Sequence, residues 1–430
     1  MAAAAVIMQS GFGSLYAWSV FRQPLSAHYG TGITAVNVTF FISGLVFAIS
    51  TFGAGFLLRR VGPRAVGVAG GLLFGLGVFL SAFAGGSLPL LYVTYGLVAA
   101  VGGGVGLIAP IVVLPGWFPE RPGLAYSLAL VGFGVGTVVN VPLISFLLSA
   151  TGDPFRTFAV LGLSYAVLVG GAAWFVRHPP EDGGRARREP PVPETGDEER
   201  GRGAKGGSYD LGGALRTWQW YAIWVMFFLN TTVGLAVYSD AEAMAGSIAG
   251  STAAAASAFV VVVSLADTAG RLVWPILSDR IGGAGVFLAM FVLQAAALAL
   301  MPLVGAGSFV ALCVLASAVL SCYGGGYATM SALSGAYFGT RDIGTIYGSI
   351  VLASGVASFG APVLLARSAD VTGSYDLALY AMGGLMLAGC AIPLALRPPP
   401  REALESRSTF PIQSSVPPGA ARPNPLRKAR

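Results

Sequence analysis

Twelve apolar stretches, each long enough to cross a lipid bilayer as a helix, constrain this chain more than any other feature. A hydrocarbon core about 30 Å thick needs roughly 20 helical residues. Hydrophobic residues make up 55% of the 430 residues and charged residues only 10%, whereas a soluble domain carries about 25% charged residues. The sequence therefore predicts an all-α integral membrane protein. The stretches lie near residues 2–22, 35–57, 65–84, 89–112, 123–148, 157–176, 217–239, 254–277, 284–304, 307–331, 342–366 and 375–396.

A polar segment rich in proline and glycine, residues 178–215, separates six of these stretches from the other six. It has too few apolar residues to build a core, which is typical of a flexible linker. The composition of residues 398–430 is similar and predicts a disordered tail. We therefore expect two six-helix bundles, residues 1–177 and 216–397.

The two halves also carry matching landmarks at a constant offset of 220 residues. GFLLRRVG in the first half corresponds to PILSDRIG in the second, and WFPER corresponds to YFGTR. One offset shared by independent landmarks indicates a duplicated six-helix unit in parallel orientation, an arrangement that transporters use to rock two halves around a central site. The paired positions include Gly55 and Pro275, Trp117 and Tyr337, Pro142 and Pro362, and Gly104 and Gly324.

The basic residues are distributed very unequally between the two sets of loops. Of 25 Lys and Arg residues, 21 fall in one set of loops and tails, one falls in a span, and Arg22, Arg156 and Arg367 fall on the opposite side. Such asymmetry is the positive-inside pattern, which orients helices in a membrane. We therefore expect both termini to face the cytoplasm from the cell (inner) membrane. The same pattern argues against nucleic acid as a partner despite a net charge of +6.

The chain resembles the major facilitator superfamily in its twelve spans and in GFLLRRVGPR and GRLVWPILSDRIG, which follow spans 2 and 8. WFPERPGLAYSLALVG resembles the loop 4–5 signature of monocarboxylate transporters and of the oxalate/formate antiporter family. GSLYAWSVFRQPL resembles the first span of the antiporter family, and DTAGR is similar to the Asp-x-x-x-Arg of span 8 in proton-coupled monocarboxylate carriers. This resemblance implies a secondary active transporter of small carboxylates.

The superfamily motifs at the cytoplasmic loops suggest gating residues. Asp279 and Arg280 keep the pattern of the resembled family, whereas Arg59 replaces the acidic residue usual in the first copy. Arg121 and Arg341 end the WFPER and YFGTR turns. Their side chains either latch the two halves together or simply follow the positive-inside rule.

Asp267 and Arg271 stand within an apolar run, although an ionised group at mid-membrane costs at least about 2.5–3.5 kcal/mol. Together with Ser264 and Thr268 they follow i, i+3, i+4, i+7 spacing, which places them in one polar stripe. Such a stripe is expected to face a wet cavity or the partner half rather than lipid. Two alternatives need no ligand: the charges neutralise each other at i, i+4, or Arg271 reaches the headgroups along its own stem.

Arginine presents a planar fork of donors that matches a carboxylate. In proton-coupled monocarboxylate carriers, the resemblance implies, the aspartate holds the arginine when the site is empty. Protonation of Asp267 would then release Arg271 for the substrate. The sequence thus favours H⁺-coupled symport of a small organic monoanion such as lactate, pyruvate, formate or acetate.

Several further in-span residues are candidates for substrate contact. Tyr323 and Tyr327 are i, i+4 neighbours, and Tyr16 and Phe133 align with aromatic positions of the antiporter family. Aromatic rings would wall a small carboxylate and exclude water, although each is equally consistent with ordinary helix packing. Asn140 and Asn230 either contact substrate or hydrogen-bond across helices.

Oxalate-type exchangers are expected, by the resemblance, to bring a second cation from span 11 at the position of Ser354. The two lysines, Lys205 and Lys428, lie outside the predicted spans. One membrane cation would compensate a dianion poorly, so carboxylate antiport of the oxalate/formate type is the alternative.

Other classes of function find little support in the sequence. The three cysteines, Cys313, Cys322 and Cys390, lie in apolar spans without a CxxC pair, which predicts no metal site. No paired catalytic carboxylates or nucleotide motif indicate an enzyme or a cofactor. A membrane sensor on the same fold would usually carry a sizeable effector domain.

Overall fold

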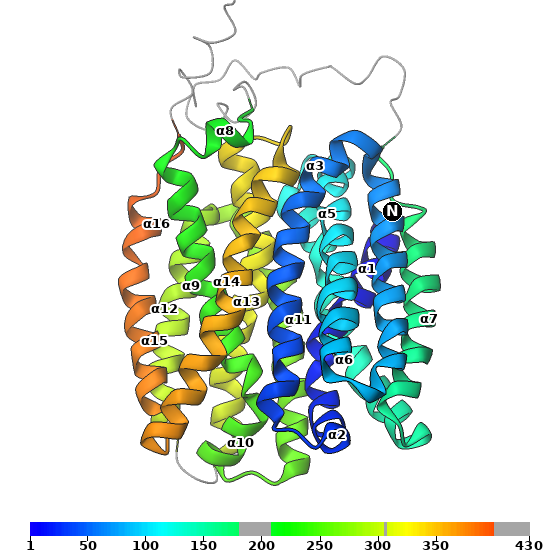
Figure 1. Cartoon of the computed structure of the whole chain (residues 1–430). Coiled ribbons are helices and arrows are strands. Elements are labelled where there is room, and N and C mark those ends of the chain that lie inside the picture. Colours follow the sequence, from blue (N-terminus) through cyan, green and yellow to red (C-terminus); the bar gives the residue numbers. More distant parts are fainter. Residues whose placement is uncertain (180–207, 305–307, 400–430) are drawn as a thin grey trace, which may run out of the picture.

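The computed structural model describes residues 1–179, 208–304 and 308–399, and within these ranges it contains helices and no strands (Figure 1). The predicted linker between 180 and 207 and the predicted tail from 400 onward lie outside the described residues.

The first half is built from α1 (Ala2–Phe12), η1 (Gly13–Trp18), α2 (Ser19–Tyr29), α3 (Ile33–Leu80), η2 (Ser81–Gly86), α4 (Leu88–Leu91), η3 (Tyr92–Ala99), α5 (Ala100–Trp117), α6 (Pro122–Thr151) and α7 (Pro154–Ala173). The second half is built from α8 (Leu211–Ala214), α9 (Trp218–Ser239), α10 (Ala241–Ala249), α11 (Ala253–Ile281), α12 (Gly283–Leu300), η5 (Met301–Leu303), α13 (Phe309–Phe338), α14 (Ile343–Thr372), α15 (Asp376–Gly389) and α16 (Ala391–Ala395).

The described residues account for the twelve membrane crossings that the sequence predicts. Ten helical stretches are long and apolar enough to span a bilayer. One of them, Ile33–Gly86, is 54 residues long and breaks at Gly62, so it supplies two crossings. α1, η1 and α2 follow one another from Ala2 to Tyr29 and supply one more. The predicted fold class is confirmed.

The break in α3 shows how the duplicated sequence folds the same way twice. Gly62 has a φ of 81° and Gly282, 220 residues later, has a φ of 78°. Side chains with a Cβ rarely adopt such positive φ angles. Glycine therefore permits a sharp reversal after RRV in the first half and after DRI in the second, which supports the repeat read from the sequence.

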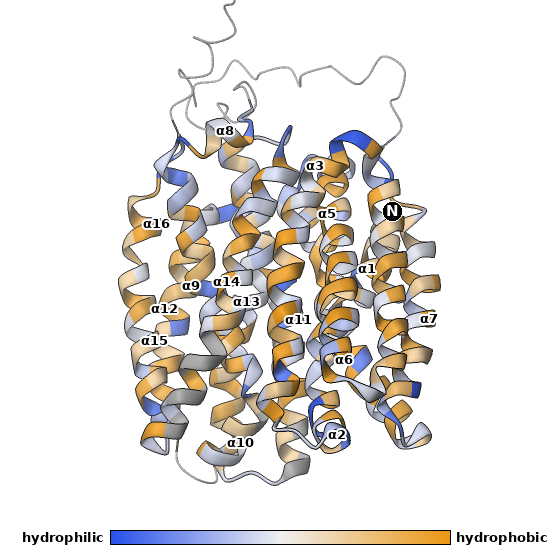
Figure 2. Cartoon of the chain, in the orientation of Figure 1, coloured by the Kyte–Doolittle hydropathy of each residue, from blue (hydrophilic) through white to orange (hydrophobic). Residues whose placement is uncertain are grey.

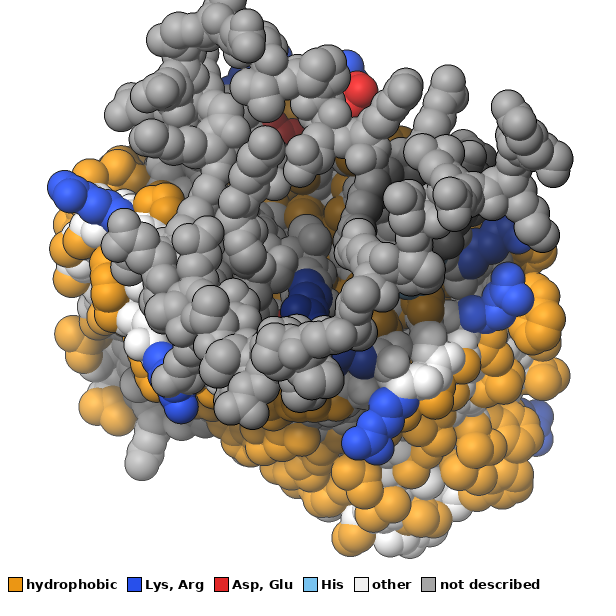
Figure 3. All heavy atoms as spheres, turned by 90° about the horizontal axis from the view of Figure 1, so that it is seen from above, with side chains coloured by type: hydrophobic (Ala, Val, Ile, Leu, Met, Phe, Trp, Pro, Cys, Tyr) orange, Lys and Arg blue, Asp and Glu red, His pale blue; other side chains and the backbone are white. Residues whose placement is uncertain are grey.

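Hydrophobic residues colour most of the helical surface, while hydrophilic residues gather toward the two ends of the bundle (Figure 2). We call the end that carries α8 the α8 end and the opposite end, which carries α2, the α2 end (Figure 1). Basic side chains are visible at several places around the α8 end (Figure 3). This distribution matches the charge asymmetry of the sequence.

The two halves meet along the middle of the molecule, where α3 packs on α14 and α6 packs on both α11 and α13 (Figure 1). α11 carries the polar stripe. Its Ser264, Asp267 and Arg271 are all buried. The stripe therefore faces protein rather than lipid, as its spacing predicts.

Two short helices are absent from the sequence prediction. α10 occupies the predicted loop between spans 7 and 8, and α8 lies within the predicted linker. Asp210 caps α8 by accepting a hydrogen bond from the backbone N–H of Gly213 at 2.7 Å. Tyr209 donates its backbone N–H to the Phe338 carbonyl at 2.8 Å, which ties this part of the linker to the end of α13.

Candidate functional site

Asp267 and Arg271 form a buried ion pair in the middle of α11. Arg271 Nε lies 3.2 Å from Asp267 Oδ2, and Nη2 lies 3.3 Å from Oδ1. The side chains are only 2% and 0% exposed, so Arg271 does not reach toward the headgroups. Their i, i+4 spacing sets this contact. A Cβ at Gly324 would overlap Asp267 Oδ1, so glycine on α13 leaves room for the carboxylate.

Aromatic rings from both halves flank the guanidinium. The Arg271 carbon Cζ lies 5.4 Å from the centre of the Phe133 ring, which α6 supplies, and 5.5 Å from the Tyr327 ring, which α13 supplies. Both distances allow cation–π attraction. Asp267 accepts from two of the five guanidinium N–H groups, and the others have no acceptor among the described residues. The pair therefore stays charged while keeping donors for a ligand.

Arg271 opens onto a small central cavity of about 60 Å³ between the halves. Among its described lining residues Arg271 alone is charged. The remaining wall is mostly apolar or aromatic, with three hydroxyl groups from Ser43, Ser354 and Ser358. Each of these hydroxyls donates to a carbonyl of its own helix, at 2.7 to 2.8 Å, which leaves its lone pairs as acceptors. The cavity thus offers one cation and a few hydroxyls in an otherwise greasy space.

A layer of tyrosines closes the cavity toward the α2 end. The hydroxyls of Tyr16 and Tyr323 are 2.5 Å apart and join the two halves. The ring of Tyr238 lies 5.4 Å from that of Tyr16, and its hydroxyl lies 2.7 Å from Ser264 Oγ. The layer therefore includes a residue of the polar stripe.

The α8 end is closed by two contacts at positions related by the 220-residue repeat. In the first, Arg59 Nη1 donates to Asp342 Oδ1 at 2.9 Å, from α3 to the start of α14. In the second, Asp279 Oδ1 accepts from the backbone N–H of Gly123 at 3.0 Å, from α11 to the start of α6. The arginine that departs from the family pattern thus has an acidic partner in the opposite half.

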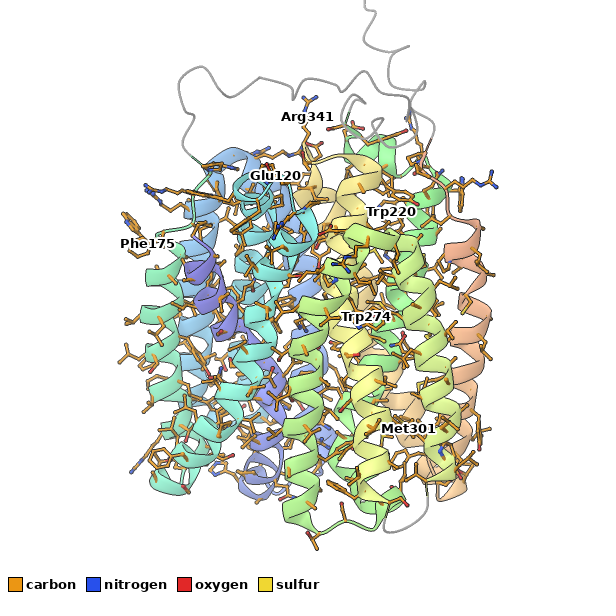
Figure 4. All side chains as sticks on the ribbon, turned by 180° about the vertical axis from the view of Figure 1, so that it is seen from behind. Glu120, Phe175, Trp220, Trp274, Met301 and Arg341 are labelled. Carbon is orange, nitrogen blue, oxygen red and sulfur yellow. The ribbon has the colours of Figure 1, made fainter. Side chains whose placement is uncertain are left out.

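The other predicted gating arginines make no such contact. The side chains of Arg121, Arg280 and Arg341 form no hydrogen bond or ion pair within the described ranges. Arg341 points away from the bundle at the α8 end (Figure 4). For these three, the positive-inside interpretation is the one that the geometry favours.

The structure does not bring Asn140 and Asn230 to the cavity. Asn140 donates to the carbonyls of Ser10 and Gly136 and accepts from the Tyr165 hydroxyl at 2.6 Å, all within the first half. Asn230 donates to the Cys322 carbonyl at 3.2 Å within the second half. These amides hold neighbouring helices together, and we remove both from the candidate site.

Sequence reasoning missed Tyr238 and the serine hydroxyls of the cavity. Tyr238 stands 220 residues after Trp18, so the repeat signals an aromatic residue at matched places. Ser43 and Ser358 carry no comparable signal, because serine is common in membrane helices and only packing shows which ones face the cavity.

Comparisons with known proteins agree with this geometry. A sequence profile of the Major Facilitator Superfamily matches residues 3–362. The oxalate:formate antiporter of Oxalobacter formigenes is 28% identical over 348 residues, which cover 80% of this chain and 78% of the antiporter. Monocarboxylate transporter 13 of Rattus norvegicus is 32% identical over 141 residues, 32% of each chain.

The fold also has a counterpart among solved structures. The crystal structure of the transporter FucP in the outward conformation superposes with a TM-score of 0.64 at 16% identity, covering 91% of this chain and 97% of that one. At this identity the likeness shows the fold alone.

Proposed function

Because the chain belongs to the major facilitator superfamily and is a transporter of that family, we propose that it carries small monocarboxylates together with H⁺ by alternating access. The observation that carries this proposal is the geometry of Arg271. Its guanidinium is buried between the two halves, is flanked by aromatic rings, and keeps N–H groups without a protein acceptor.

A carboxylate fits this site better than a neutral or cationic solute. The guanidinium fork can donate two parallel hydrogen bonds to a carboxylate. A dry, aromatic wall strengthens that interaction, because little water competes for the charges. The hydroxyls of Ser354 and Ser358 lie in the same wall.

Proton coupling follows from the contact between Arg271 and Asp267. The empty site holds one positive and one negative group and is neutral. A carboxylate that enters with its own charge makes the site negative unless Asp267 takes up a proton. Since a net charge within the membrane is costly, the loaded carrier crosses with one anion and one proton.

The number of cations limits the substrate to a monoanion. Ser354, at the position where the resembled exchangers are expected to place a cation, lines the cavity with a neutral hydroxyl. A dianion such as oxalate would keep one uncompensated charge. Anion antiport of the oxalate/formate type is the second candidate, and the likeness to the antiporter of Oxalobacter formigenes over 80% of the chain favours it.

Alternating access requires contacts that open in turn at the two ends. We propose that Arg59–Asp342 and Asp279–Gly123 close the α8 end in this state, while the tyrosine layer closes the cavity toward the α2 end. The basic loops place the α8 end in the cytoplasm of a cell with the protein in its inner membrane.

Uptake into proteoliposomes tests the coupling. Formate, acetate, lactate and pyruvate are offered with an inward proton gradient, without a gradient, and with an internal counter-anion. We expect the gradient to drive accumulation by the wild type, and Asp267→Asn to retain exchange while losing the response to the gradient. Gradient-driven accumulation by Asp267→Asn would exclude Asp267 as the proton carrier, and strict dependence on an internal anion would favour antiport.

A further inference from the structure

A second cavity, of about 140 Å³, lies beyond the tyrosine layer at the α2 end. It shares Tyr16, Phe40 and Leu235 with the lining of the central cavity. Any solute that approaches Arg271 from the α2 end therefore passes through this space, which we call the vestibule.

The vestibule has its own arginine. Arg22, in α2, lines it and is partly buried. Its Nη1 donates to the backbone carbonyl of Ser239 at 3.1 Å, a bond that joins the first half to the second. The rest of its guanidinium has no acceptor among the described residues, and Arg22 forms no ion pair with a described carboxylate.

The neighbours of Arg22 leave its charge incompletely compensated. Asp240 lines the same vestibule, but its buried Oδ2 has no hydrogen-bond partner in the described part of the chain. The other titratable groups in the lining are the phenols of Tyr16 and Tyr238. Burial raises the pKa of Asp240, and the positive charge of Arg22 opposes that rise in part.

Another arginine at the same end shows what an ordinary surface arginine looks like. Arg156 is 76% exposed and lies 3.8 Å from Asp153, with which it forms an i, i+3 ion pair. Arg22 differs because it faces a recess with polar groups from Ser19, Thr34 and Asn37 beside it. A guanidinium with unused donors in such a recess matches a small carboxylate.

We propose that Arg22 and the polar wall of the vestibule form an outer binding site for the same class of small carboxylate that Arg271 binds. The inference rests on the proposed function for the identity of the anion. A carboxylate that docks at Arg22 replaces the Ser239 carbonyl as its acceptor. Docking therefore also removes a bond between the two halves at the α2 end and favours opening of the path to the central cavity.

Trp18 provides a local reporter, because its indole lines the vestibule. The measurement is tryptophan fluorescence of the purified protein titrated with sodium formate, acetate or pyruvate, with sodium chloride as the control salt. It is made in the Arg271→Gln background, where the central site lacks its cation. We expect a saturable change with the carboxylates that disappears when Trp18→Phe is added.

Arg22→Gln in the same background removes the outer site. Loss of a charge-assisted hydrogen bond predicts at least about tenfold weaker carboxylate binding, and Arg22→Lys, which keeps the charge, restores part of it. The melting temperature identifies variants that fail to fold, and the lysine variant then decides. An unchanged titration on Arg22→Gln, or an equal response to chloride, would overturn the outer site.

The central proposal fails separately from this one. Transport that persists in Arg271→Gln alone would refute the central site without touching the vestibule titration. Conversely, loss of transport in Arg271→Gln with no carboxylate response in its fluorescence leaves the central site standing and removes the outer one.

Discussion

Asp267→Asn separates the two things that the Asp267–Arg271 pair does. The substitution keeps the size of the side chain and removes its charge, so Arg271 is left as an uncompensated cation at 2% exposure. Breaking a buried ion pair by removing one partner costs about 3–5 kcal/mol of stability. A bound carboxylate restores the missing negative charge. We therefore expect the variant to be destabilised without substrate and to be rescued by it.

The same reasoning predicts tighter binding. In the wild type a carboxylate competes with Asp267 for the guanidinium, whereas in Asp267→Asn it has no competitor. If the carboxylate recovers the lower figure, about 3 kcal/mol, binding tightens by roughly a hundredfold. It should also lose its dependence on pH, because the group that must be protonated before Arg271 is released has gone.

Thermal unfolding of the purified protein, with and without formate, acetate or pyruvate, measures both effects. Asp153→Asn is the matched control, since it neutralises an exposed i, i+3 pair worth about 0–1 kcal/mol, and asparagine still caps a helix. The control should melt and respond like the wild type. A variant Asp267→Asn with wild-type melting and wild-type binding would refute the account of the pair.

Three further predictions concern the gate, the vestibule and the substrate. Arg59→Asp places two negative charges together and should change the rate of exchange in proteoliposomes, while the charge-reversed double variant with Asp342→Arg returns it toward the wild type; equal rates in all three would show that the pair does not gate. Because burial raises the pKa of Asp240, its neutral form persists to higher pH, so carboxylate binding in the vestibule should strengthen as pH falls through that pKa. Asp240→Asn should bind equally well across the range, and a wild-type titration curve that is flat with pH would contradict this. Ser354→Lys adds a second cation to the central cavity and should improve competition by oxalate by about tenfold or more; oxalate that competes no better would show that position 354 does not set the charge of the substrate.

Local periodicity was enough to predict the pairing of Asp267 with Arg271. Helical spacing fixes which side chains share a face, and the high cost of a bare charge in lipid demands that this face be covered. Sequence also predicted the crossings and the two matching reversals, because hydropathy and glycine act locally. Asn140 and Asn230 show the limit, since an in-span amide satisfies itself on a neighbouring helix as readily as on a ligand.

Contacts between the halves were beyond the reach of the sequence. The partner of Arg59 is 283 residues away, and it is acceptable only because α14 begins opposite the α3 reversal. Tyr238 joins the tyrosine layer because α9 ends next to η1 across the interface. Both depend on how two bundles are rotated against each other, which no local pattern encodes.

Counterflow of radiolabelled formate, acetate, lactate and pyruvate in proteoliposomes, compared for the wild type, Arg271→Gln and Arg156→Gln, tests most directly whether a single buried guanidinium binds the transported anion. Each variant removes one arginine, from the centre of the bundle or from its exposed surface. We expect Arg156→Gln to exchange substrate like the wild type and Arg271→Gln to lose exchange at every concentration tested. Exchange by Arg271→Gln at the wild-type rate would contradict the account.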